Sequence, residues 1–375
     1  MDKVKIFPGK LKGKIHVPTS KSQTHMSILC AAMAKGVSKI RNVVLSEDIS
    51  ATIEAARAFG AEVAETESCK NGKLSDLVVS GKGALGKTRK TIDCAESGST
   101  LRFSIPLALA TGEEFEFVGR GKLPERPMDD YYRIFKEKGI QFETDGGKLP
   151  LTVKGRLEAG KYSLEGNVSS QFVTGLLLSL PIAGGPSEIA LKSPLESGTY
   201  VDITIRVQED FGVKVDRDGY NSFSIEKQSY RPADVEMEGD YSQAAFWMVA
   251  GLIGEKVEME GLKPDSLQGD RAAVELLRRM GGRLHDTQGS MTAEQSSMNS
   301  IEMDASDCPD LVPIMAVAAA LAEGTTTITN AERLRYKESD RLKATREELN
   351  KLGAMIAETE DGLVVKGVET LSGGV

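Results

Sequence analysis

The sequence has few of the residues that build metal sites, disulfide frameworks and membrane spans. It contains four cysteines and three histidines in 375 residues, and no two cysteines form a CxxC pair. Scattered thiols are typical of small buried side chains in a reducing compartment, so we expect neither a metal site nor disulfides. No apolar run reaches the roughly 18 residues that a membrane span needs. The cysteines are Cys30, Cys69, Cys94 and Cys308.

Positive charge is also in short supply. The 47 basic residues are outnumbered by 55 acidic ones, which gives a net charge of −8. This balance disfavours nucleic acid as the main partner. A local cluster of cations can still bind a small anion, because charges act at short range. The first residues, MDKVKIFPGK, contain no apolar signal region, so we expect a cytoplasmic protein.

Internal repetition is the strongest pattern in the chain. A helix pattern that ends in glycine and runs into a strand occurs five times, about 70 to 80 residues apart. Glycine at such a helix end favours a left-handed cap. These glycines are Gly60, Gly139, Gly212, Gly281 and Gly353.

A second pattern precedes each glycine, in the same phase. A short strand leads through a turn of small polar residues into a helix that is apolar on most faces, as in YSLEGNVSSQFVTGLLLSL. The polar turn suits a helix N-cap, and an all-apolar helix should be buried. Each unit therefore reads as strand, buried helix, strand or strands, exposed amphipathic helix, strand. The sequence predicts an α/β protein built from repeated βαβαβ-type units.

Several of these turns carry residues suited to binding anions. A strand that enters a helix presents free backbone N–H groups and the positive end of the helix dipole. Lys21 and Ser22 stand at the first turn, Gly98 at the second, and Ser169, Ser170 and Gln171 at the third. Simple helix capping with a solvated side chain explains each turn equally well by itself.

Three further sites carry charge in unusual places. In the segment RYKESDR, Lys337 and Arg341 are four residues apart and should share one helical face, with Glu338 between them as a possible proton carrier. The alternative is a solvated helix start with ion pairs. Arg126 lies in a loop between Glu125 and Pro127, and Asp310 opens a buried helix.

Taken together, the motifs SKSQTH, ESGSTLR, ERPM, GNVSSQF and YKESDRL resemble those of the enolpyruvyl transferases, and specifically the 5-enolpyruvylshikimate-3-phosphate synthases. The likeness runs along the whole chain, with five motifs in the right order. The related UDP-N-acetylglucosamine enolpyruvyl transferases are an alternative with the same fold. The resemblance implies two similar domains, an inside-out α/β barrel: residues 19–233 as a complete three-repeat domain, and residues 1–18 with 234–375 as the other.

The resemblance also implies a reaction. Shikimate 3-phosphate would receive the enolpyruvyl group of phosphoenolpyruvate on its 5-hydroxyl, releasing phosphate on the route to chorismate and aromatic amino acids. A monomer without cofactor or metal is implied, with these two small molecules as its partners. Lys21, Asp310 and Glu338 would be catalytic. Shikimate 3-phosphate would be held by Lys21, Ser22, Ser169, Ser170, Gln171, Ser197, Tyr200, Asp310 and Lys337, and phosphoenolpyruvate by Lys21, Gly98, Arg126, Gln171 and Arg341.

Two departures from the family pattern stand out. Met26 occupies the position of an arginine that would grip the shikimate carboxylate. A sixth repeat is missing after Gly353, so we expect the second domain to be one repeat short and to leave apolar faces around residues 310–321 uncovered. Three interpretations stay open: an enzyme, an impaired homologue that only binds shikimate 3-phosphate, or a fragment.

Overall fold

The computed structural model of the protein describes residues 7, 9–67, 74–86, 88–287 and 289–373. These residues form two compact units. Unit A consists of Thr19–Met237 together with Tyr336–Glu338. Unit B consists of the described residues up to Pro18, Glu238–Arg335 and the residues from Ser339 on.

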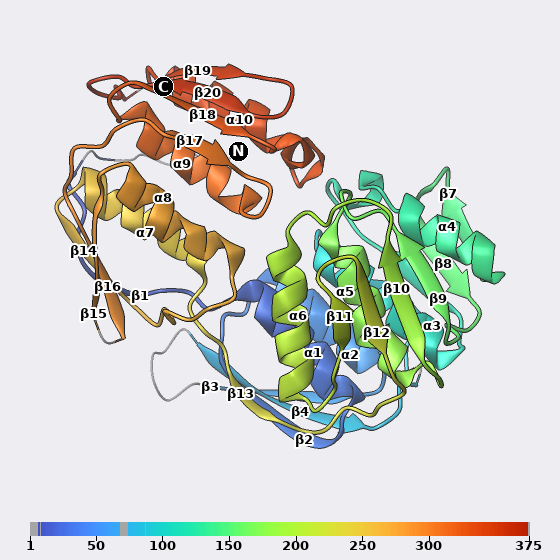
Figure 1. The fold of residues 1–375 in the computed structure, drawn as a ribbon. Coiled ribbons are helices and arrows are strands. Elements are labelled where there is room, and N and C mark those ends of the chain that lie inside the picture. The colour runs from blue at the N-terminus through green and yellow to red at the C-terminus, as the bar shows by residue number, and fades with distance from the viewer. Residues whose placement is uncertain (1–6, 8, 68–73, 87, 288, 374–375) are drawn as a thin grey trace. The chain divides into compact units, whose positions relative to one another are not determined.

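Within the described residues, one βαβαββ motif occurs five times (Figure 1). The predicted order of strands and helices is confirmed, with two strands after the second helix, but burial does not alternate strictly, because α2 and α7 each bury just over half of their residues. The first copy is β1 (Lys12–His16), α1 (Lys21–Met33), β2 (Lys35–Val43), α2 (Glu47–Ala58), β3 (Glu62–Glu67) and β4 (Ser75–Lys82). The second is β5 (Thr91–Asp93), α3 (Gly98–Thr111), β6 (Phe115–Val118), α4 (Asp129–Lys138), β7 (Gln141–Asp145) and β8 (Lys148–Lys154).

The other three copies keep the same order. The third is β9 (Lys161–Leu164), α5 (Ser170–Ser179), β10 (Ser187–Leu191), α6 (Gly198–Asp210), β11 (Asp216–Asp218) and β12 (Ser222–Ile225). The fourth is β13 (Asp234–Glu236), α7 (Tyr241–Ile253), β14 (Lys256–Glu260), α8 (Ala272–Arg279), β15 (Arg283–Thr287) and β16 (Ser290–Glu294). The fifth is β17 (Glu302–Asp304), α9 (Val312–Ala320), β18 (Thr325–Thr329), α10 (Arg341–Lys351), β19 (Met355–Glu358) and β20 (Leu363–Lys366).

Each copy contributes to a four-stranded mixed sheet, and two of the sheets exchange a strand. In β5-β6-β8-β7 the first pair is parallel and the others are antiparallel, and the remaining sheets follow the same scheme. The exchange places β1 beside β14 and β13 beside β2. Unit A therefore extends to Met237, a few residues past the expected boundary at 233, because β13 belongs to its sheet. In the described part of the chain, unit A holds three sheets and unit B two.

Helix ends follow the local sequence. All five glycines that were predicted to cap helices have positive φ, between 67° and 97°. At the N-termini, Ser20, Ser97, Ser169 and Asp240 accept hydrogen bonds from backbone N–H groups two or three residues on. These caps satisfy donors that the helix itself leaves free.

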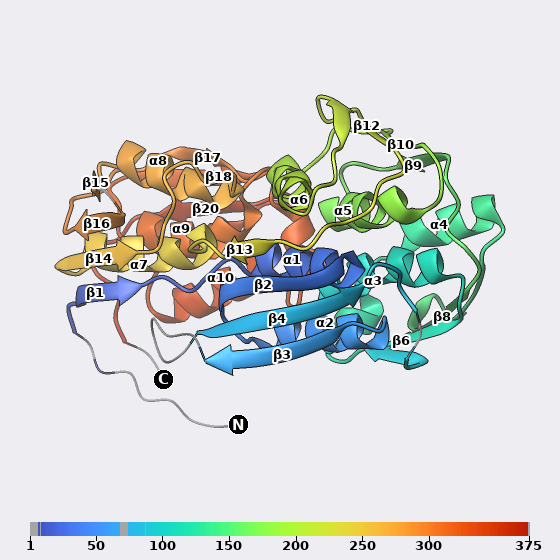
Figure 2. The ribbon, with the colours of Figure 1, turned by 90° about the horizontal axis from the view of Figure 1, so that it is seen from below.

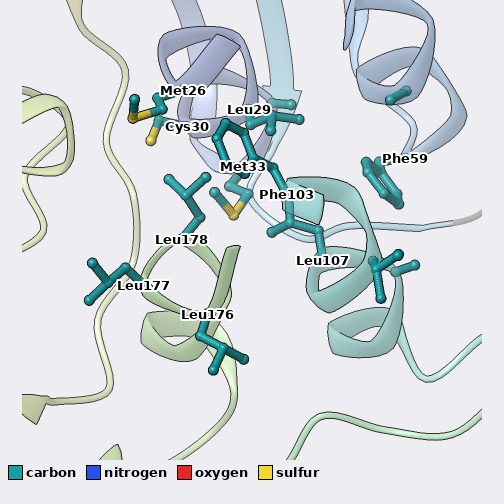
Figure 3. Close-up of a cluster of buried hydrophobic side chains, with 14 of the residues drawn as sticks. Met26, Leu29, Cys30, Met33, Phe59, Phe103, Leu107, Leu176, Leu177 and Leu178 are labelled. Carbon is teal, nitrogen blue, oxygen red and sulfur yellow. The ribbon is translucent and has the colours of Figure 1, made fainter. Parts of the chain in front are cut away.

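The core of unit A lies among its apolar helices. Figure 3 shows side chains of α1, α3 and α5 gathered around Met33, Phe103 and Leu178. Figure 2 views β2, β4 and β3 side by side next to α1, which packs on this sheet. Met26 is part of the same core, with 1% of its surface exposed. Cys30, Cys94 and Cys308 are buried thiols as predicted, whereas Cys69 lies outside the described residues.

In unit B the exposed apolar surface lies elsewhere than predicted. Helix α9 is almost entirely buried, with Met315 and Ala319 each 1% exposed, so the expectation of uncovered faces around residues 310–321 is wrong. In helix α7, Trp247 is partly buried, whereas Phe246 (47%) and Ile253 (40%) are exposed. These positions are spaced by about two helical turns and form one stripe. No helix in the described ranges is long and apolar enough to span a membrane.

Candidate active site

The first candidate turn holds a lysine at the start of α1. Ser20 caps the helix, so Lys21 is its first residue and Ser22 lies partly buried in the first turn. Lys21 Nζ lies 2.7 Å from the Asp48 carboxylate at the start of α2. The Lys21 side chain is half exposed.

A buried polar chain lies behind Lys21, and sequence reasoning missed it. His25 Nδ1 lies 2.7 Å from Thr52 Oγ1, which lies 2.7 Å from Thr100 Oγ1. Thr100 in turn bonds to the Ser97 cap, so the chain links α1, α2 and α3. Burial, and then the charge of Lys21, lower the pKa of His25 to about 3. The ring is therefore neutral at physiological pH.

The second turn places two arginines around a glycine. Gly98 is the first residue of α3, and a side-chain carbon built on it would lie 2.7 Å from Arg126 Nη1 and 3.4 Å from Arg102 Nη1. Arg126 is 8% exposed and Arg102 is 5% exposed. Two buried guanidinium groups thus lie beside a helix N-terminus, and both favour negative charge nearby.

The third turn adds neutral hydrogen-bonding groups to the same unit. Ser169 caps α5 and accepts from the Gln171 N–H, and Ser170 is buried beside it. Gln171 accepts from Arg102 at 2.7 Å and donates to Ser99 Oγ at 3.0 Å. The amide therefore lies between Arg102 and Ser99, the residue after Gly98.

Ser197 and Tyr200 lie at the start of α6. Ser197 is buried and adopts a left-handed backbone conformation, with φ of 54°. Its side chain does not cap α6, and Tyr200 follows in the first turn. Holding serine in this conformation is strained, and such strain is common at ligand sites.

The segment around Lys337 differs from the prediction of one helical face. Residues Glu332–Tyr336 form a 3₁₀ helix, the chain then bends, and α10 begins only at Arg341. The reason is Asp340, whose side chain accepts from the Lys343 N–H and fixes the helix start. Lys337 and Glu338 precede the helix and group with unit A, where Glu338 Oε1 lies 3.3 Å from Arg126 Nη1.

Asp310 and Arg341 belong to unit B and bind each other. Asp310 lies in a 3₁₀ turn, Pro309–Leu311, directly before α9. Arg341 Nη1 donates to its carboxylate at 2.5 Å. The negative charge of Asp310, before the buried helix α9, is thus paired with the Arg341 guanidinium.

Unit A brings together cationic groups and neutral hydrogen-bond donors. Lys21, Arg102 and Arg126 supply positive charge, Gln171 and the serines supply neutral donors, and Glu338 is a carboxylate beside Arg126. Within the described ranges, no three His, Cys, Asp or Glu side chains gather as a metal site would require.

Residues 7–375 match the family described as EPSP synthase (3-phosphoshikimate 1-carboxyvinyltransferase). The chain belongs to this family. A relative from Clostridium novyi that carries the name 3-phosphoshikimate 1-carboxyvinyltransferase is 47% identical across the whole chain, which covers 87% of that relative. A relative of the same name from Clostridium kluyveri is also 47% identical and is covered over 86% of its length.

Solved structures show the same fold. An EPSP synthase from Acinetobacter baumannii, 27% identical, aligns with a TM-score of 0.77 over 96% of this chain and 82% of its own. The enolpyruvyl transferase NikO from Streptomyces tendae shares the fold at 20% identity, with a TM-score of 0.71. The predicted enolpyruvyl transferase fold is thereby confirmed.

The sequence-predicted residues divide between the two units. Asp310 and Arg341 lie in unit B, and the others lie in unit A. Arg102 was not predicted as a site residue from the sequence. Its signal was available in ESGSTLR, where an arginine stands in a helix that is otherwise apolar and therefore buried.

Proposed function

We propose that this protein transfers the enolpyruvyl group of phosphoenolpyruvate to the 5-hydroxyl of shikimate 3-phosphate and releases phosphate. Membership of the EPSP synthase family and the shared name of the Clostridium relatives support this reaction. The observation that carries the proposal for the site is the cationic cluster of unit A, where Arg126 and Arg102 lie beside Gly98 at a helix N-terminus and Gln171 accepts from Arg102.

The proposed roles follow from the chemistry of each group. Phosphoenolpyruvate is anionic and would lie at Gly98, Arg126 and Gln171, with Lys21 and Arg341 balancing its charge. Glu338 would carry the methylene proton, and its Oε1 lies 3.3 Å from Arg126 Nη1. Asp310 would accept the hydroxyl proton, with Arg341 holding its carboxylate in place.

Shikimate 3-phosphate would be held by hydroxyl, amide and cationic groups. Lys21 and Asp310, which have roles in the preceding paragraph, would also contact shikimate 3-phosphate. Cationic side chains, rather than a metal or cofactor, would balance the negative charge of the substrates. The remaining proposed contacts are Ser22, Ser169, Ser170, Gln171, Ser197, Tyr200 and Lys337.

The comparisons do not favour the alternatives. The relatives at 42–47% identity carry the shikimate-pathway name rather than a UDP-sugar name. A homologue that only binds shikimate 3-phosphate is likewise not favoured. The two substrates would be the partners of a cytoplasmic monomer that binds no nucleic acid, in keeping with the net charge of −8.

We further propose that unit B is one βαβαββ repeat shorter than unit A. Three observations support this: two sheets against three among the described residues, the exposed stripe of Phe246 and Ile253 on α7, and coverage of 87% of a relative's length. In unit A, the buried helices α1, α3 and α5 pack on one another. A third helix packed on α7 would cover the stripe.

Phosphate release tests the proposed reaction. Phosphoenolpyruvate and shikimate 3-phosphate are mixed with the protein, and each substrate is also supplied alone. We expect release only when both are present, and a large loss in Arg126→Ala because a preorganised charge contact typically contributes about 10²–10³ in rate. Phosphate release at the same rate with and without shikimate 3-phosphate would exclude this reaction.

A further inference from the structure

Arg102 is a buried arginine of the cationic cluster that is not among the proposed substrate contacts. Only 5% of its surface is exposed, and burying an unpaired charge is strongly unfavourable. Its Nη2 donates to the Pro127 carbonyl at 2.9 Å, and its guanidinium carbon lies 4.9 Å from the centroid of the Phe172 ring. Its Nη1 donates to Gln171 Oε1 at 2.7 Å. Gln171, the acceptor of this last bond, is one of the proposed contacts to phosphoenolpyruvate.

This contact determines which end of the Gln171 amide faces which way. A guanidinium group has donors but no acceptor, so only Oε1 can lie against Arg102. The other end, Nε2, donates to Ser99 Oγ at 3.0 Å. An amide nitrogen carries two N–H groups, and among the described contacts only Ser99 accepts from Nε2, so a second donor is available to a ligand. If the amide were reversed, it would place its N–H groups against a cation.

The helices hold Arg102 firmly in this position. Helices α3 and α5 approach closely at Gly175, where an added side-chain carbon would lie 2.4 Å from the Arg102 carbonyl oxygen. The Tyr131 hydroxyl donates to the same carbonyl at 2.7 Å. Burial, and then the neighbouring charge of Arg126, lower the pKa of Arg102 to about 9, which leaves it charged at neutral pH.

We propose that Arg102 is a positioning residue that locks the Gln171 amide with Nε2 directed to the anionic substrate. The inference deepens the proposed function and rests on it for the identity of that substrate, phosphoenolpyruvate. Lysine cannot replace Arg102 in this role, because a single ammonium cannot bond the Pro127 carbonyl and the Gln171 amide in one planar fork.

A double-mutant cycle on substrate affinity tests the coupling. The dissociation constant of phosphoenolpyruvate is measured by calorimetry with phosphoenolpyruvate as the sole substrate, for Arg102→Lys, Gln171→Ala and the double variant. We expect each single change to weaken binding about tenfold, and the double variant to be no weaker than the weaker single one. Multiplicative losses of about a hundredfold would overturn the proposal. Arg133→Lys is the matched control, because Arg133 bonds only Asp130 and the Ser163 carbonyl among the described contacts.

A second measurement needs no ligand. The side-chain amide resonances of Gln171 are recorded in protein labelled with ¹⁵N-glutamine and assigned with Gln171→Ala. Arg102→Lys should move them toward the position of solvent-exposed glutamine, whereas Arg133→Lys should not. Unchanged resonances in Arg102→Lys would overturn the proposal. If the unaltered protein binds neither substrate, the proposed function fails, and these resonances still decide whether Arg102 positions Gln171.

Discussion

Replacing Gly98 with alanine should separate ligand binding from folding stability. The added carbon would lie 2.7 Å from Arg126 Nη1 and 3.1 Å from its Cζ. Ordinary contact needs about 3.4 Å or more, so the guanidinium must move by about 0.7 Å. A shift of this size breaks a charge-assisted hydrogen bond to a bound anion, and losing such a bond costs about 1.5–3 kcal/mol. We therefore expect phosphoenolpyruvate to bind roughly 10- to 100-fold more weakly.

Stability should change little in the same variant. The end of a flexible side chain can move aside, and alanine is the better helix former at the first position of α3. Calorimetry gives the affinity, and denaturant unfolding gives the free energy of unfolding. Gly86→Ala is the control, since nothing lies within 4 Å of a carbon added there. Unaltered affinity in Gly98→Ala would refute the assignment of Arg126 as an anion contact.

Three further predictions concern other parts of the molecule. The pKa of His25 is about 3 in the folded protein and near 6.5 in the unfolded one, so the free energy of unfolding should fall as pH drops below 6.5, by roughly 2 kcal/mol at pH 5. His25→Asn should remove this pH dependence from the unfolding curves. An unchanged pH dependence in His25→Asn would contradict a neutral, buried His25. Met26→Arg should lower the free energy of unfolding by about 3 kcal/mol or more, because it buries a charge without a partner. Met26→Leu should lower it by less than about 1.5 kcal/mol. Equal stability of the two variants would show that position 26 is not in the core. If a further repeat covers α7, adding the segment of the Clostridium novyi relative that this chain does not cover should raise the melting temperature. The double variant Phe246→Glu, Ile253→Glu should abolish that increase. An increase that persists in the double variant would mean that the segment packs elsewhere.

Local features of the fold could be read from the sequence. The five glycines at helix ends have positive φ because the left-handed conformation is a property of a single residue. The serines before α1, α3 and α5 cap them because a cap needs only the next two or three residues. Periodicity and capping thus gave the repeat and its helices.

Features that depend on distant residues were beyond such reasoning. The exchange of β1 and β13 joins strands more than 190 residues apart, as in the pair Asp234 and Lys39, and no local pattern encodes it. The start of α10 was misjudged because the cap at Asp340 outweighed the spacing of Lys337 and Arg341. Arg102 was missed because its importance depends on α5 lying beside α3.

The most direct test of the account is product formation from shikimate 3-phosphate and phosphoenolpyruvate, followed by ³¹P NMR. The protein is assayed alone and with the added Clostridium novyi segment, beside Lys21→Met and the control Lys161→Met, which alters an exposed lysine paired with Glu188. The account predicts enolpyruvyl product and free phosphate in equal amounts, stimulation by the segment, loss in Lys21→Met and no loss in Lys161→Met. No product in either form of the protein, or equal product from both lysine variants, would contradict it.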